Sequence, residues 1–521
     1  MSDQTLPQLV QTAAEKFADN IAIQEQDKRI SFKELNALRS QACRAFMAAG
    51  VEKGDRVAIW APNISEWIIA AIGLHSAGAV LVPLNTRMKG SEAAFILNES
   101  GAKFLLTVAG FLGIDYPAML ANEAMPSLEK IVLLRGATEA QTQQPLEEWS
   151  AFINGADTIS EDAAEQRTQT LSPSDSMDIM FTSGTTGKPK GVISAHGQNI
   201  KSFTTWSNTV GLTATDNYLI INPFFHSFGY KAGWLSAIIQ GAKMLPVLTF
   251  DLDEVLAQIE RDKISMLPGP PTIYQSLLAH PNRGDYDLSS LRLAVTGAAA
   301  VPVELVNQMW NDLGFETVVT AYGLTETCGV VTICRPEDSA EIISTTSGRA
   351  MPGVDVKCVN TDGASVAIGE AGEICVRGYN VMQGYFNNPQ ATQEAIDAEG
   401  WLHTGDVGVL DEQGYLRITD RLKDMIISGG FNVYPAEIEN GLASIAGVVQ
   451  SAVVGIDDER MGEVPKAFIV KQQGSELDVQ AVIDWCKANM ANYKVPRAVE
   501  FIDAMPLNAA GKILKTELRG R

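Results

Sequence analysis

The chain has 521 residues, of which 46% are hydrophobic and 20% are charged. It is too long for one hydrophobic core, so we expect at least two domains. Its formal net charge of −22 at pH 7 argues against nucleic acid or an anionic membrane surface as the main partner.

The N-terminal segment is polar and lacks the basic-then-apolar pattern of a secretory signal, which predicts a cytoplasmic protein. Within it, Leu6, Val10 and Phe17 have the spacing of one face of a short helix. The longest apolar stretches, such as 67–74, are too short to span a bilayer, so we expect no transmembrane segment. The six cysteines have no metal-ligand spacing and suit buried free thiols.

Strands and helices then alternate, which is typical of an α/β fold. Apolar runs at 56–61 and 79–84 predict two buried strands, with a helix at 66–76 between them. Further strands of this kind are predicted at 218–222, 243–248, 266–267 and 291–296. The polar segment 135–176 is interpreted as a surface excursion that leads to the next strand.

Residues 181–191 read Phe-Thr-Ser-Gly-Thr-Thr-Gly-Lys-Pro-Lys-Gly, a composition that suits a loop around a polyphosphate. Glycines let the backbone approach phosphate oxygens, and hydroxyl and ammonium groups donate to them. Backbone amides in such loops form an anion-binding nest. The candidate phosphate ligands are Thr182, Ser183, Gly184, Thr185, Thr186, Gly187, Lys188 and Lys190. The common Gly-x-x-x-x-Gly-Lys-Ser/Thr spacing is missing, and a mobile polar loop is the alternative.

Three later segments carry further candidate chemistry. Residues 321–327 read Ala-Tyr-Gly-Leu-Thr-Glu-Thr, which offers an aromatic ring for a purine and a carboxylate for a cation. Residues 401–406 read Trp-Leu-His-Thr-Gly-Asp and place a carboxylate after a glycine turn, although such turns are also ordinary. A lysine follows another glycine turn at 506–512, in a tail that has seven basic and three acidic residues from Trp485 onward.

These motifs, in this order, resemble the adenylate-forming superfamily of acyl- and aryl-CoA synthetases, luciferases and peptide-synthetase adenylation domains. The resemblance covers almost the whole chain and is strongest to the AMP-forming acyl-CoA synthetases. It implies that ATP and a carboxylic acid form an acyl adenylate and that CoA then displaces AMP, with Mg²⁺ as the cofactor. The adenylate is needed because a carboxylate is a poor electrophile and AMP is a good leaving group.

The fold implied is α/β, with a large N-terminal domain of α/β sheet layers plus a barrel-like β unit and a small mobile C-terminal α+β domain. Glycine turns between short strands after about residue 345 suit the β unit. The charged segment 420–424 suits a linker between domains. We therefore expect an adenylating domain at 1–420, with the acid, ATP and Mg²⁺ sites, and a mobile domain at 421–521 that carries the catalytic lysine.

The resemblance also implies roles for individual residues of the nucleotide site. Tyr322 would flank the adenine, Thr325 would contact the α-phosphate and Glu326 would hold Mg²⁺, the last two as catalytic residues. The other implied nucleotide-binding residues are Gly297, Ala298 and Ala299 of a small-residue adenine wall, Gly323, and the ribose contacts Asp406 and Arg421.

In the C-terminal domain the matching lysine is Lys512, which would bridge the substrate carboxylate and the α-phosphate. The nearby Lys515 is expected to have only a structural role. Lys423 stands where the family has its hinge. Because Lys512 cannot occupy the site while CoA attacks, the small domain would rotate between the half-reactions. Gly429 and Gly430 would then face the pantetheine arm of CoA, with a surface turn as the alternative.

The segment 223–234 matches the family's aromatic segment beside the acyl group, and its pocket candidates are His226, Phe228, Tyr230 and Trp234. His226 would close over the adenylate, unless it is a packing histidine. No carboxylate stands where amino-acid-activating enzymes pair the substrate amine, so an α-amino acid is disfavoured. The pattern resembles ligases for the bicyclic propanoate left from steroid ring breakdown and some medium-chain fatty acid ligases, and we prefer the former.

Three other activities remain open at this point. A luciferase-type oxygenase shares all of these motifs, and an adenylating enzyme that loads a carrier protein differs only in its acceptor. A nucleotide-binding module without ligase activity is the alternative of a different class. Homodimer formation is also left open.

Overall fold

The computed structural model describes residues 2–182, 189–297, 301–421, 424–428, 431–458, 461–490, 492–507 and 513–520. The chain packs as two compact units. The first unit comprises Met1–Asp355 and Arg377–Leu402, and the second comprises Val356–Val376 and His403–Arg521. The domain boundary expected after residue 420 stays a prediction.

The first unit contains a nine-stranded sheet in the order β19-β10-β9-β4-β3-β5-β7-β8, with β6 paired to β5. Its strands are β3 (Arg56–Trp60), β4 (Val80–Pro83), β5 (Phe104–Phe111), β6 (Ile114–Asp115), β7 (Lys130–Arg135), β8 (Leu146–Glu148), β9 (Ser176–Thr182), β10 (Lys190–Ala195) and β19 (Gly384–Tyr385). β4, β3, β5 and β7 are parallel, as the predicted strand–helix–strand unit requires. β9 and β10 form an antiparallel hairpin.

Two four-stranded sheets, β11-β12-β1-β2 and β13-β14-β15-β16, make up the rest of the first unit. Their strands are β1 (Ile21–Glu25), β2 (Lys28–Ser31), β11 (Asn217–Ile220), β12 (Lys243–Pro246), β13 (Leu293–Thr296), β14 (Thr317–Tyr322), β15 (Thr332–Ile333) and β16 (Arg349–Ala350). Met266 bridges Tyr218 of β11 and Leu293 of β13, so it links the two sheets. The strands predicted near 218, 243 and 291 are therefore confirmed, whereas the one predicted at 266–267 is a single bridge residue, Met266.

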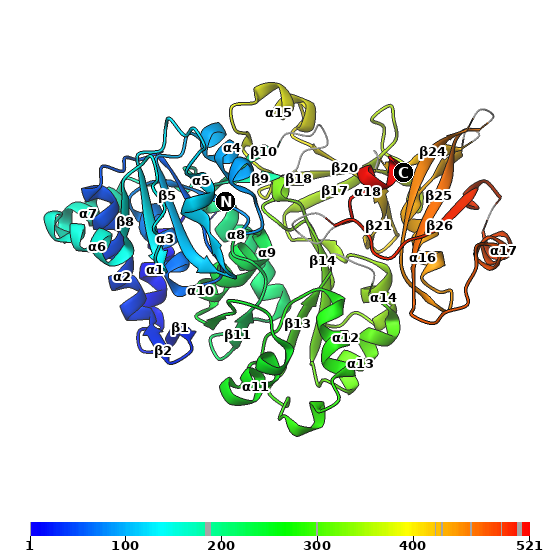
Figure 1. Cartoon of the computed structure of the whole chain (residues 1–521), viewed down its shortest axis with the longest axis horizontal. Coiled ribbons are helices and arrows are strands. Elements are labelled where there is room, and N and C mark those ends of the chain that lie inside the picture. Colours follow the sequence, from blue (N-terminus) through cyan, green and yellow to red (C-terminus); the bar gives the residue numbers. More distant parts are fainter. Residues whose placement is uncertain are drawn as a thin grey trace. The chain divides into compact units, whose positions relative to one another are not determined.

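Helices cover these sheets, and Figure 1 shows α2 and α3 close to the sheet that contains β5. The longer helices are α1 (Leu6–Lys16), α2 (Phe32–Ala48), α3 (Ser65–Ser76), α4 (Gly90–Ser100), α7 (Glu161–Gln169), α8 (His196–Val210), α11 (Leu252–Asp262), α12 (Pro271–Ala279) and α13 (Val303–Asn311). The shorter ones are α5 (Tyr116–Leu120), α6 (Trp149–Asn154), α9 (Ser227–Gly229), α10 (Ser236–Gln240), α14 (Ala340–Thr345) and α15 (Pro389–Ala395). α3 is apolar on all sides, and every one of its residues except Glu66 is buried.

The segment 135–176 is more structured than the expected surface excursion, because it contains β8, α6 and α7. Phe152 of α6 packs edge-on against Phe46 of α2, with ring centroids 5.0 Å apart. Ala164 and Thr168 of α7 are also buried. The polar composition reflects a single layer of helix whose inner side needs only a few apolar residues.

The second unit contains two sheets. The first has the order β17-β18-β20-β21, and its strands are β17 (Val354–Val359), β18 (Ala371–Gly378), β20 (Leu402–Leu410) and β21 (Leu416–Arg421). The second has the order β23-β22-β25-β24, with β26 paired to β25; its strands are β22 (Ile426–Ser428), β23 (Phe431–Val433), β24 (Val448–Asp458), β25 (Gly462–Lys471) and β26 (Ala498–Phe501). These sheets correspond to the predicted glycine-rich β unit and to the C-terminal α+β segment.

The long β24–β25 hairpin has a core on each face. α16 (Pro435–Leu442) and α17 (Val479–Asn489) cover the face that includes Val453, because their buried residues belong to the same core cluster as Val453. Ala452 and Val454 point to the other face, where they pack with Leu518 of α18 (Lys515–Arg519). Alternation along the strand thus buries both faces of the sheet.

All six cysteines are free and buried, as predicted. Among the described residues, no helix combines the length and the apolar character that crossing a membrane would require.

Candidate functional site

The predicted phosphate loop connects the two strands of the β9–β10 hairpin. Thr182 at the end of β9 lies opposite Lys190 at the start of β10, and Phe181 lies opposite Gly191. The loop is therefore closed at its base by a paired ladder, and this ladder fixes the first and last of its predicted ligands. The other predicted ligands, Ser183, Gly184, Thr185, Thr186, Gly187 and Lys188, lie outside the described residues.

The segment with the predicted adenine and metal contacts begins at the carboxyl end of β14, which is parallel to β13. Tyr322 ends β14, and Gly297 directly follows β13, so these two candidates lie at the same edge of the sheet. Such edges are where ligands bind in open α/β sheets. Ala298 and Ala299 follow Gly297 outside the described residues.

Gly323 has a reason to be glycine that involves no ligand. A Cβ atom at this position would lie 2.3 Å from the carbonyl oxygen of Gly329, because the chain folds back on itself there. Between these two glycines the chain forms a 3₁₀ turn at Thr325–Thr327, and the side chains of Thr325 and Glu326 are both partly exposed. The close approach at Gly323 thus shapes the turn that presents Glu326.

Glu326 is held by residues that are distant in the sequence. The hydroxyl of Tyr385 donates a hydrogen bond to Oε1 of Glu326 at 3.0 Å, and the backbone N–H of Met382 donates to the Glu326 carbonyl at 2.8 Å. The Lys190 ammonium lies 5.0 Å from the centre of the Tyr385 ring. Tyr385 therefore joins two predicted ligands, and the sequence motifs do not point to it, since it stands outside all of them.

The predicted ribose site lies in the second unit. Asp406 on β20 is the cross-strand partner of Arg421 on β21, so the two predicted ribose contacts are neighbours along the backbone; the Arg421 side chain is outside the described set. Asp406 is buried, with 6% of its surface exposed. Its N–H donates to Oγ1 of Thr404 at 3.1 Å, and Thr404 in turn donates to the Ile374 carbonyl at 2.7 Å.

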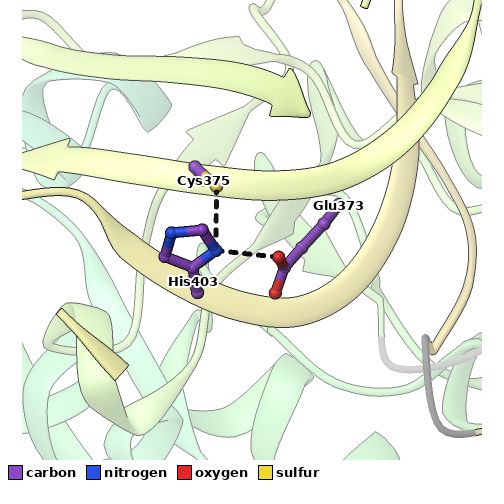
Figure 2. A group of neighbouring side chains, drawn as sticks. All are labelled: Glu373, Cys375 and His403. Atoms are coloured by element: carbon purple, nitrogen blue, oxygen red, sulfur yellow. Dashed lines mark hydrogen bonds and ion pairs between the residues drawn. The ribbon is translucent and has the colours of Figure 1, made fainter. Parts of the chain in front are cut away.

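Glu373, Cys375 and His403 lie beside this turn (Figure 2). Glu373 and Cys375 are two residues apart on β18 and therefore point to the same face of the sheet. His403 lies on the neighbouring strand β20. Oε2 of Glu373 is 2.8 Å and Sγ of Cys375 is 3.6 Å from the same nitrogen, Nδ1 of His403. The other carboxylate oxygen of Glu373 accepts a hydrogen bond from the Gly405 N–H at 3.1 Å.

The contacts within this cluster indicate which role it can have. A nucleophilic relay needs the thiol and the carboxylate on different ring nitrogens, whereas here both face Nδ1. A thiol and an imidazole are zinc-type ligands and do not suit Mg²⁺, which prefers oxygen. Because Glu373 bonds both His403 and Gly405, the cluster supports the Thr-Gly-Asp turn that carries Asp406.

The predicted acyl segment follows β11 and turns sharply. His226 caps α9 by accepting a hydrogen bond from the Phe228 N–H through Nδ1 at 3.2 Å. Its side chain is solvent-accessible, yet the surrounding protein lowers its pKa by desolvation. A Cβ atom at Gly229 would lie 2.2 Å from the Asn222 carbonyl oxygen, which explains the glycine in the turn. Phe228 is partly exposed.

Tyr230 and Trp234, by contrast, are fully buried in the π-helical turn Tyr230–Leu235. Their rings stack at 4.8 Å, and Trp67 of α3 packs edge-on against both. Their predicted role as pocket residues stays a prediction, and in this structure their contacts are with the core. π-Helical turns are often found at functional sites.

Between these two residues, Lys231 ties the acyl segment to the phosphate-loop hairpin. Its ammonium lies 3.3 Å from Oδ1 of Asp178 on β9, and both side chains are about 1% exposed. Lys231 also donates to Oγ of Ser194 on β10 at 3.1 Å, and Ser194 donates to Asp178 at 2.7 Å. The Asp178 charge is thus already compensated, so it does not supply a partner for a substrate ammonium.

The remaining predicted residues cannot be placed. Beyond those of the phosphate loop and the adenine wall, the candidates that lie outside the described residues are Lys423, Gly429, Gly430 and Lys512. Their roles therefore stay predictions.

Two family models match the chain. The model described as AMP-binding enzyme matches residues 10–386, and the model described as AMP-binding enzyme C-terminal domain matches residues 437–512.

Similar proteins cover the chain from end to end. A 7a-methyl-1,5-dioxo-octahydro-1H-inden-4-yl propanoyl:CoA ligase from Rhodococcus jostii is 47% identical over 99% of this chain and 98% of its own. A ligase of the same name from Mycobacterium tuberculosis is 48% identical, again over 99% of this chain and 98% of its own. Among solved structures, ATP-bound MatB from Rhodopseudomonas palustris superposes with a TM-score of 0.86 at 27% identity and covers 99% of both chains.

Proposed function

The chain belongs to the AMP-binding enzyme family and is an acyl-CoA ligase, and we propose that its acid is a bicyclic, ring-bearing propanoate. The observation that carries the proposal is the 47–48% identity, over 99% of the chain, to two ligases whose names specify a propanoyl group on a fused two-ring system. In the proposed reaction the acid attacks the α-phosphate of ATP, pyrophosphate leaves, and the CoA thiol then displaces AMP.

On the nucleotide side, the residues would divide the work as follows. Thr182, Lys190 and the loop between them would cradle the phosphates, supported by the closed base of the β9–β10 hairpin. Asp406 would accept hydrogen bonds from the ribose hydroxyls, supported by the bonds that fix its turn. Lys512 would bridge the two reacting anions, and Lys423 would be the hinge on which its domain rotates.

A Mg²⁺ ion is proposed at Glu326. The donor set fits, because Glu326 is a partly exposed carboxylate on the turn after β14, and Mg²⁺ usually takes one or two carboxylates together with phosphate oxygens. When bound, the ion would neutralise charge on the phosphates. The chain itself fixes one Glu326 oxygen through Tyr385.

On the acid side, an apolar substrate is supported by the acyl segment. Phe228 and His226 are accessible, and Asp178 is already paired with Lys231. Apolar burial contributes about 0.8 kcal/mol per CH₂, so an acid of about nine to fourteen carbons should be preferred over acetate by orders of magnitude. Homodimer formation and a cytoplasmic location remain predictions.

The test is a panel of acids assayed for CoA-dependent AMP release. A propanoate on a fused two-ring system should give the highest kcat/KM, ahead of octanoate, with acetate and α-amino acids far below. A maximum at octanoate or decanoate would replace the proposed acid by a medium-chain fatty acid. A maximum at acetate or an amino acid would contradict the apolar pocket altogether.

The acceptor is tested on the same preparation. CoA should be acylated in preference to pantetheinylated carrier protein, and no light or oxygen consumption should accompany the reaction. Carrier-protein acylation at a higher rate than CoA acylation would make the enzyme a loading enzyme.

A further inference from the structure

Tyr385 lies on the short edge strand β19, where the backbone fixes its position. It is the cross-strand partner of Val192 on β10. The N–H of the next residue, Phe386, donates to the Gly191 carbonyl at 2.7 Å, and the N–H of Gln383 donates to the Ile193 carbonyl at 2.9 Å. Since β10 begins at Lys190, this pairing places Tyr385 beside the base of the predicted phosphate loop.

From this position one side chain contacts two opposite charges. The Lys190 ammonium lies over the Tyr385 ring, 5.0 Å from its centre, and the Tyr385 hydroxyl donates to Oε1 of Glu326 at 3.0 Å. We propose that Tyr385 is a positioning residue that sets Lys190 and Glu326 for the phosphates and metal of ATP. This inference deepens the proposed function and rests on it.

The chemistry of the contact suits this role. The phenol hydroxyl of Tyr385 is the donor and Oε1 of Glu326 is the acceptor. A hydrogen bond to a carboxylate is stronger than one between neutral groups. It fixes the orientation of Glu326 through one of the two carboxylate oxygens. The ring face attracts the ammonium without neutralising it.

A second tyrosine provides an internal comparison. Tyr379 carries the Lys201 ammonium at 4.4 Å from its ring centre, but its hydroxyl bonds the neutral Thr205 at 3.4 Å. Tyr379 therefore has the same ring–cation contact without a carboxylate. Replacing each tyrosine by phenylalanine removes one hydroxyl and keeps the ring, so the two variants differ mainly in the partner that is lost.

The experiment measures ATP binding by calorimetry at a series of Mg²⁺ concentrations, together with acid-dependent pyrophosphate exchange. Tyr385→Phe should raise the Mg²⁺ concentration for half-maximal ATP binding and exchange by about three- to tenfold, as expected for one lost charged hydrogen bond. Affinity for ATP at saturating Mg²⁺ should change by less than about twofold, because Lys190 keeps its ring. Tyr385→Leu should weaken ATP binding at saturating Mg²⁺ as well.

Two controls decide between positioning and general support. Tyr379→Phe should leave the Mg²⁺ titration unchanged. Adding Tyr385→Phe to Glu326→Gln should produce no further shift, since both changes act through one contact. An unchanged Mg²⁺ titration in Tyr385→Phe, or an equal shift in Tyr379→Phe, would overturn the proposal.

Calorimetry separates this test from the proposed function. If the wild-type protein binds ATP with Mg²⁺ but exchanges pyrophosphate with none of the acids, the proposed substrate fails, and the Mg²⁺ shift in Tyr385→Phe still decides the role of Tyr385. Absence of any Mg²⁺-dependent ATP binding by the wild-type protein would overturn both.

Discussion

Glu326 and Asp406 are the two carboxylates expected to serve the nucleotide, and the chain supports them in different ways. Asp406 is held locally: its N–H bonds Thr404, two residues away in the same motif. Glu326 is held from a distance, by the hydroxyl of Tyr385, which is 59 residues further along the chain. A motif that contains its own support can be recognised as a unit, whereas support from another strand becomes visible only in three dimensions.

Asp406 also has support from a residue that is distant in the sequence, but this support is indirect. Glu373 reaches it through the backbone, by accepting from the Gly405 N–H while pairing with His403 (Figure 2). The Tyr385 hydroxyl, by contrast, donates directly to the Glu326 carboxylate. We therefore expect substitution of Glu373 to change the geometry of the turn that carries Asp406. Substitution of Tyr385 should instead change the affinity for the metal ion.

The largest loss of activity should come from substituting Lys512, and the effects of substituting Asp406 and Glu326 can be compared with it. Lys512→Ala should reduce acid-dependent pyrophosphate exchange about 100-fold or more, as for other lost donors that stabilise developing charge. It should still convert supplied acyl adenylate and CoA to thioester. The two half-reactions are measured separately, and equal damage to both would remove Lys512 from the adenylation step.

Asp406→Ala should give the next largest effect. It removes a charge-assisted hydrogen bond worth roughly 1.5–3 kcal/mol and should raise the KM for ATP about 10- to 100-fold. The Mg²⁺ requirement should stay the same. Initial rates over a matrix of ATP and Mg²⁺ concentrations provide the measurement, and a shift mainly in the Mg²⁺ dependence would break the distinction between the two carboxylates.

Glu326→Gln should show the converse. It keeps an acceptor for the Tyr385 hydroxyl but removes the metal-binding charge, so we expect about a tenfold higher Mg²⁺ requirement. The ATP affinity at saturating Mg²⁺ should change little. If the Mg²⁺ titration of this variant matches that of the wild-type protein, Glu326 is only structural.

Glu373→Gln should have a smaller effect that sharpens the comparison. The amide can still accept from Gly405 but loses the carboxylate oxygen that faces Nδ1 of His403, so the KM for ATP should rise by about two- to fivefold, in line with the loss of part of one hydrogen-bond network. Cys358→Ser, on the neighbouring strand β17, is the matched control for a buried substitution in the same sheet. An effect of Glu373→Gln as large as that of Asp406→Ala would give Glu373 a direct role.

The last expectation concerns folding stability and not nucleotide binding, and it bears on the pH at which these comparisons are made. Burial lowers the pKa of His196 to about 4 and that of His75 well below 6.5. Between about pH 6.5 and 4 the unfolded chain therefore binds more protons than the folded chain, so stability should fall as the pH falls, by up to about 1.4 kcal/mol per pH unit for each histidine. Well above pH 6.5 both histidines are neutral in both states and add no slope.

Thermal melts from pH 7 to pH 5 check this expectation. His196→Gln should flatten the dependence, whatever its effect on stability at pH 7. A melting temperature that does not change over this range would mean that the two histidines gain protons in the folded protein.

The sequence predicted much of the fold, because the apolar runs at 56–61 and 79–84 and the alternation around them are strong signals of parallel strands. It missed the helices of 135–176, because a helix that buries only Ala164 and Thr168 leaves a weak apolar pattern. Family resemblance supplied the motif residues of the site. Tyr385 could not be predicted from them, since its role depends on the pairing of β19 with β10.

The most direct test of the account is a single-turnover reaction of the wild-type protein with ATP, Mg²⁺ and a ring-bearing propanoate, first without CoA and then with it. The account predicts one equivalent of enzyme-bound acyl adenylate and of pyrophosphate, followed on CoA addition by acyl-CoA and AMP. Formation of ADP, or acyl-CoA that appears without any acyl adenylate, would contradict it.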